Sequence, residues 1–204
     1  MQKTLPRLRK EETALLIIDM QNDFVKPEGY FGRIGKNVKP VLDIIPNIAN
    51  LLDFCRRNNI LRIFVRTIHS EYTNSYVWVS RYGTNETPPL CLPNSWGAEI
   101  IDELRPRDDE CIVTKHRYSA MLDTDLPLIL RSKRITTLLI TGTATNVCVD
   151  STARHAFMMD FITITLRDCV ATTDVELHEP TLKNLAQYFG YVADSKDIMK
   201  MLLS

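Results

Sequence analysis

A carboxylate, an ammonium group and a thiol each follow a short apolar run in this sequence. Asp19 closes "TALLIID", Lys115 closes "ECIVTK", and Cys148 follows "ITTLLITG" through the small-residue turn "TATNV". Apolar runs of this kind are typical of strands in a parallel sheet, and in open parallel sheets ligands bind at the carboxyl ends of the strands. We therefore expect Asp19, Lys115 and Cys148 to converge at one edge of a sheet.

The three groups together are suited to attack on a carbonyl carbon. A cation at Lys115 and the N-terminus of a following helix would favour the thiolate of Cys148. Asp19 would take up the thiol proton and later pass it to a leaving amine. The oxyanion formed by the attack needs donors, and the backbone N–H groups of Ala144 and Cys148 in the turn are the expected pair.

Each of the three residues also has a purely structural interpretation. Asp19 could cap a helix or accept loop hydrogen bonds, Lys115 could extend to the surface after a buried strand, and Cys148 could be a small core residue. Their coincidence at three strand ends favours the chemical interpretation over three independent structural ones.

The pattern of apolar residues predicts the elements that position these groups. Strands are expected at 13–19, 60–67, 110–115, 135–142, 161–168 and 190–194, and helices at 38–59, 123–134, 146–160, 179–190 and 195–204. Continuous rather than alternating hydrophobicity in the strands indicates a parallel sheet that is covered on both faces. Repeated β-α-β units predict a right-handed doubly wound α/β sheet with helices on both faces.

Composition narrows the class of protein. The 204 residues predict one domain, 1–204, in which the insertion 68–109, rich in Gly, Pro, Asn, Tyr and Trp, forms a pocket wall, a lid or an interface. Lys plus Arg and Asp plus Glu each total 25, so there is no general electrostatic footprint for nucleic acid, and a small-molecule partner is expected.

No apolar run is long enough to cross a membrane and no signal peptide is apparent, which favours a cytoplasmic location. The five cysteines show no zinc spacing and are expected to be free thiols.

Three segments carry a family resemblance. "ALLIIDMQNDF", "VTKHRYSAM" and "LITGTATNVCVDSTARHA" resemble, in order and spacing, the signature segments of the isochorismatase-like cysteine hydrolase superfamily. The resemblance implies a Rossmann-like three-layer α/β/α fold with a mostly parallel six-stranded sheet and a catalytic triad at Asp19, Lys115 and Cys148. It also implies a cis peptide between Thr143 and Ala144, just before the oxyanion hole, and a homo-oligomer, commonly a dimer or tetramer.

The resemblance also indicates a reaction. Isochorismatases that cleave a vinyl ether lack the cysteine, so Cys148 favours an amide-type substrate. Nicotinamidases add a metal through an Asp-x-His element, whereas the corresponding region here has His69 as its only histidine, so we expect no metal and no cofactor. "KHRYSAM", "LILRSKRI" and "TGTATNVCVDSTAR" look most like the branch that hydrolyses ureidoacrylate, biuret and N-carbamoyl compounds.

The leading hypothesis is therefore a metal-independent cysteine amidohydrolase that cleaves a C–N bond of a small ureido or carbamoyl compound. The resulting intermediate would be cleaved by water or would collapse without it, and the sequence does not choose between these routes. One alternative is a nicotinamidase-like enzyme or another small carboxamide hydrolase. Further alternatives are a non-catalytic ligand-binding member of the fold and a thiol redox sensor.

Candidates for substrate binding lie beside the triad and in the insertion. Gln21 and Asn22 could orient Asp19 or the substrate amide, or could only stabilise a turn. Tyr118 could place its hydroxyl on a ureido oxygen or only pack, and Asn146 could bind substrate or cap the helix. An arginine such as Arg81 would bind a substrate carboxylate through its planar fork, unless it is a solvated loop charge. The full set of candidates is Gln21, Asn22, Tyr30, His69, Arg81, Trp96, Tyr118 and Asn146.

Overall fold

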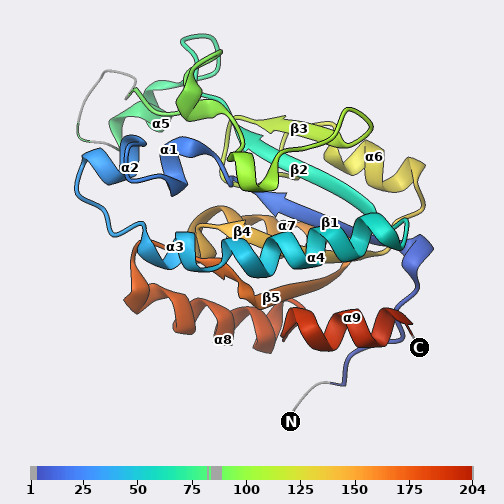
Figure 1. Cartoon of the computed structure of the whole chain (residues 1–204). Coiled ribbons are helices and arrows are strands. Elements are labelled where there is room, and N and C mark those ends of the chain that lie inside the picture. The colour runs from blue at the N-terminus through green and yellow to red at the C-terminus, as the bar shows by residue number, and fades with distance from the viewer. Residues whose placement is uncertain (1–3, 82, 84–88, 204) are drawn as a thin grey trace.

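A parallel sheet forms the centre of the protein, and helices cover both of its faces (Figure 1). The computed structural model describes residues 4–81, 83 and 89–203. Over these residues six strands pair in the order β3-β2-β1-β4-β5-β6, and every neighbouring pair is parallel. The chain reverses its direction of travel across the sheet between β3 and β4, which leaves β1 and β4 side by side at the centre.

The strands fall where the apolar runs predicted them. Their bounds are β1 Thr13–Ile18, β2 Leu61–Thr67, β3 Cys111–Lys115, β4 Thr137–Thr143, β5 Ile162–Ala171 and β6 Tyr191–Ala193. All six residues of β1 and all seven of β4 are buried, as expected for strands covered on both faces. β5 continues three residues beyond the predicted end at 168, because its pairing with β4 resumes past an irregularity between Ile140 and Gly142.

The helices are α1 Asn22–Val25, α2 Tyr30–Arg33, α3 Lys39–Asp43, α4 Ile45–Arg57, α5 Tyr76–Ser80, α6 Leu126–Ser132, α7 Asp150–Met158, α8 His178–Tyr188 and α9 Ser195–Leu203. The helix predicted over 38–59 is two helices, because Pro46 occupies the first turn of α4, where its missing N–H is tolerated. The helix predicted over 146–160 begins as a π-helical turn, Thr145–Val149, and becomes α-helical only at Asp150.

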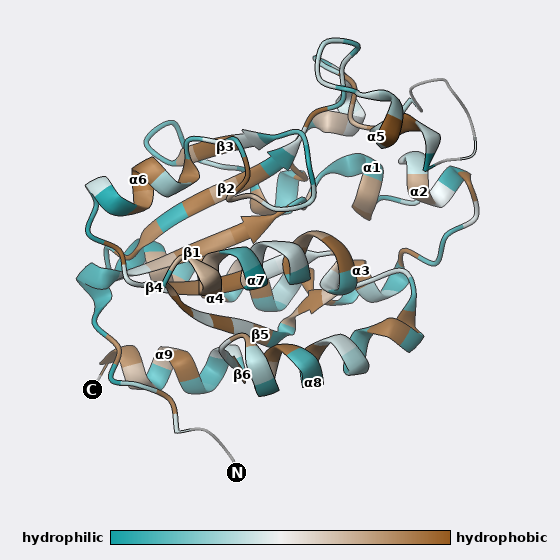
Figure 2. Ribbon diagram, turned by 180° about the vertical axis from the view of Figure 1, so that it is seen from behind, coloured by the Kyte–Doolittle hydropathy of each residue, from teal (hydrophilic) through white to brown (hydrophobic). Residues whose placement is uncertain are grey.

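Two hydrophobic clusters separate the layers. Alternate residues of a strand point to opposite faces of the sheet, and β1 sends Leu15 and Ile17 into one cluster and Ala14, Leu16 and Ile18 into the other. The first cluster packs against α3, α4 and α9, and the second against α6, α7 and α8. Figure 2 shows the central strands as the most hydrophobic part of the ribbon. The three-layer α/β/α architecture is therefore confirmed, with a sheet that is wholly parallel rather than mostly so.

Gly142 lets the two central strands approach closely just before the turn that leads to Cys148. It has a φ of +107°, and a Cβ atom built on it would lie 2.0 Å from the carbonyl oxygen of Ile18. Any other residue would therefore push β4 away from β1 at the point where both strands end.

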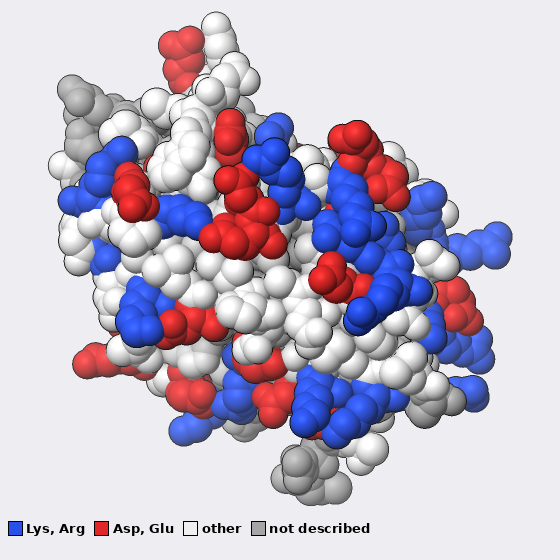
Figure 3. Space-filling view, viewed as in Figure 1, with Lys and Arg blue, Asp and Glu red and all other residues white. Residues whose placement is uncertain are grey.

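The segment 68–109 has two parts (Figures 1 and 2): its described residues up to Ala98 form the rim above the carboxyl ends of the strands, and residues 102–109 run beside α4 to the amino end of β3. It contains α5 and two short 3₁₀ turns, Trp96–Ala98 and Asp102–Leu104, and its residues 82 and 84–88 lie outside the described part. Figure 3 shows Lys and Arg interspersed with Asp and Glu on one face of the molecule, in keeping with a chain of zero formal charge. In the described residues, none of the helices has the length and hydrophobicity needed to cross a bilayer.

Candidate active site

Asp19 is held in place by the ends of β1 and β2. It directly follows β1 and has a φ of +53°, a left-handed conformation that aspartate tolerates better than most residues. Its backbone N–H donates to the carbonyl of Val65. The Thr67 hydroxyl at the end of β2 donates to Oδ1 of Asp19 over 2.9 Å. The carboxylate is therefore fixed at the edge of the sheet, with only 1% of the residue exposed.

Lys115 is a fully buried cation at the end of β3. Its ammonium group lies 2.8 Å from Oδ2 of Asp19. It also donates to the Thr67 hydroxyl at 2.6 Å and to Cys148 Sγ at 3.4 Å. Burial is the largest single effect and works against the ammonium form, but the interactions with Asp19 and Cys148 together outweigh it and raise the pKa of Lys115. The lysine is therefore charged at neutral pH.

Cys148 lies in the π-helical turn that follows β4, and the Lys115 ammonium contacts both its sulfur and the Thr67 hydroxyl. Burial and the charge of Asp19 raise the pKa of the Cys148 thiol to about 12, although Lys115 acts in the opposite direction. Lys115 favours the thiolate, as expected from the sequence. Burial, the largest cause, and the charge of Asp19 together outweigh it, so the free protein holds a thiol rather than the expected thiolate.

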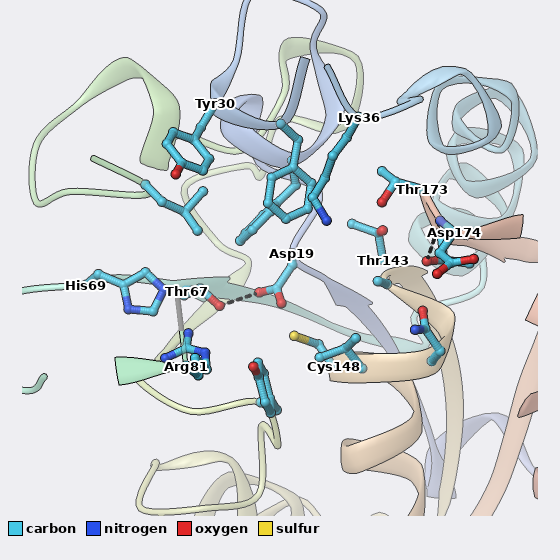
Figure 4. Close-up of a pocket in the computed structure, with 18 of the residues that line it drawn as sticks. Asp19, Tyr30, Lys36, Thr67, His69, Arg81, Thr143, Cys148, Thr173 and Asp174 are labelled. Atoms are coloured by element: carbon cyan, nitrogen blue, oxygen red, sulfur yellow. Dashed lines mark hydrogen bonds between the residues drawn. The ribbon is translucent and has the colours of Figure 1, made fainter. Parts of the chain in front are cut away.

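The two oxygens of the Asp19 carboxylate differ in their partners. Oδ1 accepts from Thr67, whereas the buried Oδ2 has only the ammonium group of Lys115 as a partner among the described residues. Figure 4 shows the Cys148 sulfur and the Asp19 carboxylate facing the same space, with Thr67 bound to the far side of the carboxylate. The site thus combines a protonated thiol, a cation and a carboxylate oxygen able to accept a proton.

The turn before Cys148 has the geometry that the sequence resemblance implied. The peptide between Thr143 and Ala144 is cis. Thr143, Ala144 and Cys148 all line the same cavity, which places the backbone of the turn beside the thiol. The assignment of the Ala144 and Cys148 N–H groups as the oxyanion hole stays a prediction.

A cavity of about 350 Å³ opens over these groups. Of the predicted substrate-binding residues, five line it: Tyr30, His69, Arg81, Tyr118 and Asn146. The insertion 68–109 supplies His69, Arg81 and also Trp78, so described residues of this segment form part of the cavity wall. This volume suits a small molecule.

Gln21, Asn22 and Trp96 are not among the described residues that line this cavity. Gln21 is fully buried and bonds both backbone groups of Thr67, accepting from its N–H and donating to its carbonyl. The Asn22 amide donates to the carbonyl of Trp96, so these two residues hold the rim against α1. Gln21 therefore supports the site only indirectly, by fixing the residue that binds Asp19.

An aromatic and cationic wall faces the thiol from the insertion side. The indole N–H of Trp78 donates to Nδ1 of His69, and the ring of Trp78 packs on that of Tyr118 at 4.7 Å between centroids. The Arg81 guanidinium lies 3.4 Å from the centre of the Trp78 ring. Burial lowers the pKa of His69 to about 4, so its imidazole is neutral at pH 7.

Several cavity residues were not predicted from the sequence. Thr67 has the clearest signal, because it ends a buried strand just as Asp19 and Lys115 do, and the same strand-end rule would have found it. Thr173 and Asp174 follow the carboxyl end of β5, which lies at Ala171 and not at the predicted 168, and Lys36 lines the cavity from a loop whose sequence gives no such signal. In the described part of the chain, no group of three or more His, Cys, Asp or Glu side chains is placed to hold a metal ion.

Comparisons with known proteins agree with this geometry. Residues 13–197 match the model of the isochorismatase domain. Ureidoacrylate amidohydrolase RutB from Acinetobacter baylyi is 30% identical over 210 residues, which cover 95% of this chain and 84% of that protein. A cysteine hydrolase from Pseudomonas syringae pv. phaseolicola superposes with a TM-score of 0.89 and 25% identity, covering 100% of this chain and 99% of the other. Nicotinamidase PncA from Bacillus subtilis superposes with a TM-score of 0.77 and 26% identity, covering 90% and 99%.

The fold and the site together define a three-layer α/β hydrolase that acts on non-peptide amide C–N bonds. The chain belongs to the isochorismatase family, since the domain model covers nearly all of it.

Proposed function

We propose that this protein is a metal-independent cysteine amidohydrolase that cleaves a C–N bond of a small ureido or carbamoyl compound through Cys148, Lys115 and Asp19. One observation supports it above the others: a buried carboxylate, Asp19, and a buried ammonium group, Lys115, lie at one cavity with the Cys148 thiol, and the ammonium lies 2.8 Å from Asp19 Oδ2 and 3.4 Å from the sulfur. Among the described residues Oδ2 has no partner other than this ion pair, so it is the oxygen of the carboxylate that can take up the thiol proton.

The first half of the reaction forms a bond from sulfur to the substrate carbonyl carbon. The thiol proton moves to Asp19 Oδ2 as Sγ attacks, so no free thiolate has to accumulate at neutral pH. Lys115 stays charged and stabilises the negative charge that passes through the sulfur. The backbone N–H groups of Ala144 and Cys148 receive the oxyanion.

The second half restores the enzyme. The C–N bond breaks as Asp19 returns the proton to the leaving nitrogen, which departs as ammonia or an amine. Water then attacks the carbonyl carbon, gives one proton to Asp19 and breaks the C–S bond, and that proton returns to the sulfur. Each step uses the same carboxylate first as acceptor and then as donor, which the fixed position of Asp19 between Thr67 and Lys115 favours.

The ureido or carbamoyl class is supported by the relative RutB, whose name gives ureidoacrylate as its substrate. It is also supported by the wall residues Tyr118 and Asn146. Tyr118 lines the cavity with 37% of its residue surface exposed, and Asn146 has a buried side-chain oxygen without a donor among the described residues. A ureido group has both N–H donors and a carbonyl acceptor, so it can satisfy both kinds of partner.

The test is ammonia release from ureidoacrylate, biuret, triuret, N-carbamoyl amino acids and nicotinamide. Wild type, Cys148→Ala and Cys111→Ala are assayed in parallel, with Cys111, a partly exposed cysteine on β3 outside the described cavity lining, as the matched control. We expect a ureido or carbamoyl compound to be the best substrate, with activity lost in Cys148→Ala and kept in Cys111→Ala. Full turnover by Cys148→Ala would contradict the proposal.

A second candidate is hydrolysis of an aromatic carboxamide, which the structural similarity to nicotinamidase PncA favours. The His69, Trp78 and Tyr118 rings could pack on such a substrate. Nicotinamide turnover that exceeds turnover of every ureido compound would select this candidate. Repeating the assay with a chelator and with added divalent metal tests the expected metal independence in either case.

A further inference from the structure

The cavity has an excess of positive charge in a protein whose formal charge is zero. Its described lining contains four cationic side chains, Lys36, Arg81, Lys115 and Arg117, against two carboxylates, Asp19 and Asp174. An electropositive cleft in a neutral protein raises the local concentration of anions. The imbalance therefore points to a substrate that carries negative charge.

Three of the four cations already have partners in the protein. Lys115 is paired with Asp19. Arg117 donates to the carbonyls of Thr73 and His116, and its guanidinium also lies 4.9 Å from the centre of the Trp78 ring. Arg81 contacts the carbonyl of Trp78 and stacks on the same ring. The arginine that the sequence singled out for a carboxylate is thus engaged with the wall itself.

Lys36 differs from these three. It follows α2, and its ammonium lies 4.7 Å from the centre of the Phe31 ring. Within residues 4–81, 83 and 89–203, the Lys36 ammonium forms neither an ion pair nor a side-chain hydrogen bond. Asp174 also lines the cavity but is not paired with Lys36. Figure 4 shows the Lys36 nitrogen pointing into the cavity above Asp19, on the roof formed by the α2 region.

We propose that Lys36 binds a carboxylate on the substrate, and hence that the substrate is a short ureido acid rather than a neutral ureide or carboxamide. This inference rests on the proposed function, because it assumes that the other end of the substrate presents its carbonyl to Cys148. Lysine is a flexible point charge, which suits one end of a small acid that reaches from the thiol to the roof of the cavity. Ureidoacrylate and N-carbamoyl amino acids carry the required carboxylate, whereas biuret and nicotinamide do not.

Lys36 is therefore a specificity residue and not a catalytic one. It contacts the tail of the substrate and none of the reacting atoms. Loss of its charge should therefore raise KM for the acid while leaving kcat nearly unchanged, because the contact is made equally in the ground state and the transition state. The same substitution should leave the kinetics of a neutral substrate unchanged.

The experiment compares wild type, Lys36→Met, Lys36→Arg and the control Lys39→Met. Lys39 is a neighbouring lysine that pairs with Asp43 on the surface and is not in the described cavity lining. Substrates are N-carbamoylglycine, its neutral amide N-carbamoylglycinamide, ureidoacrylate and biuret. We expect Lys36→Met to raise KM for both acids by about tenfold. Lys36→Arg should retain most of the affinity, and Lys39→Met should behave as wild type.

Binding without turnover separates this inference from the proposed function. Calorimetric titration of N-carbamoylglycine and ureidoacrylate into Cys148→Ala measures affinity whether or not the wild type hydrolyses either compound. Affinity for an acid that Lys36→Met lowers about tenfold in this background supports the inference even if ammonia release fails. Biuret turnover that exceeds that of both acids, equal affinities with and without Lys36→Met, or no acid binding at all would overturn it.

Discussion

The two ends of strand β3 each contain a buried cluster of ions, and we propose a chemical role for only one of them. Glu110 precedes the strand at its amino end, and Lys115 closes it at its carboxyl end. The carboxylate of Glu110 is fully satisfied: Arg56 bonds both of its oxygens, Arg62 bonds one, and the backbone N–H of Arg107 bonds the other. At Lys115, by contrast, the facing carboxylate oxygen Asp19 Oδ2 has only the Lys115 ammonium group as a partner among the described residues.

The number of hydrogen-bond donors around each buried carboxylate separates an ion cluster that only stabilises the fold from one that can take up a proton. Buried charges in native proteins are normally paired and hydrogen-bonded, because unmet partners are costly. A complete set of partners, as at Glu110, stabilises one charge state and leaves no site for a proton. At Asp19 the set is smaller, and we propose that Oδ2 takes up the proton of the Cys148 thiol.

The largest expected effect separates the two clusters by activity. Asp19→Asn removes the proton acceptor and should lower kcat/KM by about 10³-fold, the size expected of a general base, while the protein still folds. Glu110→Gln should leave kcat/KM within about twofold, because its cluster lies at the other end of the strand. Steady-state kinetics give kcat/KM for both variants, and circular dichroism checks that both are folded. Equal losses of kcat/KM in the two variants would show that the two clusters do not differ in their role in the reaction.

Lys115→Met tests whether the catalytic cluster also contributes to folding. It leaves the Asp19 carboxylate buried without its counterion, so the free energy of unfolding should fall by about 3 kcal/mol. The double variant Lys115→Met, Asp19→Asn should recover much of that loss, because no uncompensated charge remains. Urea unfolding of wild type, both single variants and the double variant measures the coupling. Strictly additive losses would show that the two side chains do not interact.

The stability that the Glu110 cluster contributes should depend on pH, and Glu110→Gln tests this. Burial opposes ionisation, but the hydrogen bonds from Arg56, Arg107 and Arg62 prevail and lower the pKa of Glu110 from 4.5 to about 2. A depressed carboxylate pKa stabilises the fold above the unfolded value of 4.5, and that stability is lost as pH falls towards 2. The variant should lose about 1–3 kcal/mol at pH 7. The gap between wild type and variant should close as the pH is lowered.

That convergence is followed by measuring urea midpoints between pH 7 and pH 2. A gap that stays constant across this range would mean that ionisation of Glu110 contributes nothing to stability. Arg7, whose side chain is outside the Glu110 cluster, gives a control variant, Arg7→Gln, that should follow wild type at every pH.

The smallest expected effect concerns the reactivity of the thiol. Burial and then the charge of Asp19 raise the pKa of Cys148 to about 12, so alkylation by iodoacetamide at pH 8 should be slow in wild type. In Asp19→Asn the second cause is absent, the pKa falls, and alkylation should accelerate by roughly tenfold for each unit of that fall. Mass spectrometry of the Cys148 peptide follows the rate. Slower alkylation in Asp19→Asn would reverse the assigned role of the carboxylate.

Much of the fold was predictable because the strands are buried on both faces. Continuous apolar runs marked all six strands to within a few residues, and the carboxyl-end rule placed Asp19, Lys115 and Cys148 together before any contact was known. The break between α3 and α4 and the π-helical turn at Thr145–Val149 were not predicted, because local hydrophobic spacing is the same on either side of them.

The walls of the site were only partly predictable. Gln21 and Trp96 were named as candidates because of their residue type and position, but their contacts are with the rim, which depends on how the chain from 89 to 103 packs against α1. Lys36 and Asp174 reach the cavity from loops, where no periodicity indicates direction. The protonated state of Cys148 was not predicted, because the sequence shows that Lys115 is near but not how deeply the thiol is buried beside Asp19.

The most direct test of the account is to trap the intermediate on the sulfur. Wild-type enzyme is mixed with its best substrate, quenched with acid during turnover and digested, and the mass of the Cys148 peptide is measured alongside Cys148→Ala. We predict an added acyl or carbamoyl group on Cys148 in the wild type, and neither adduct nor turnover in the variant. Sustained ammonia release by Cys148→Ala, or turnover with the group attached to another residue, would contradict the account.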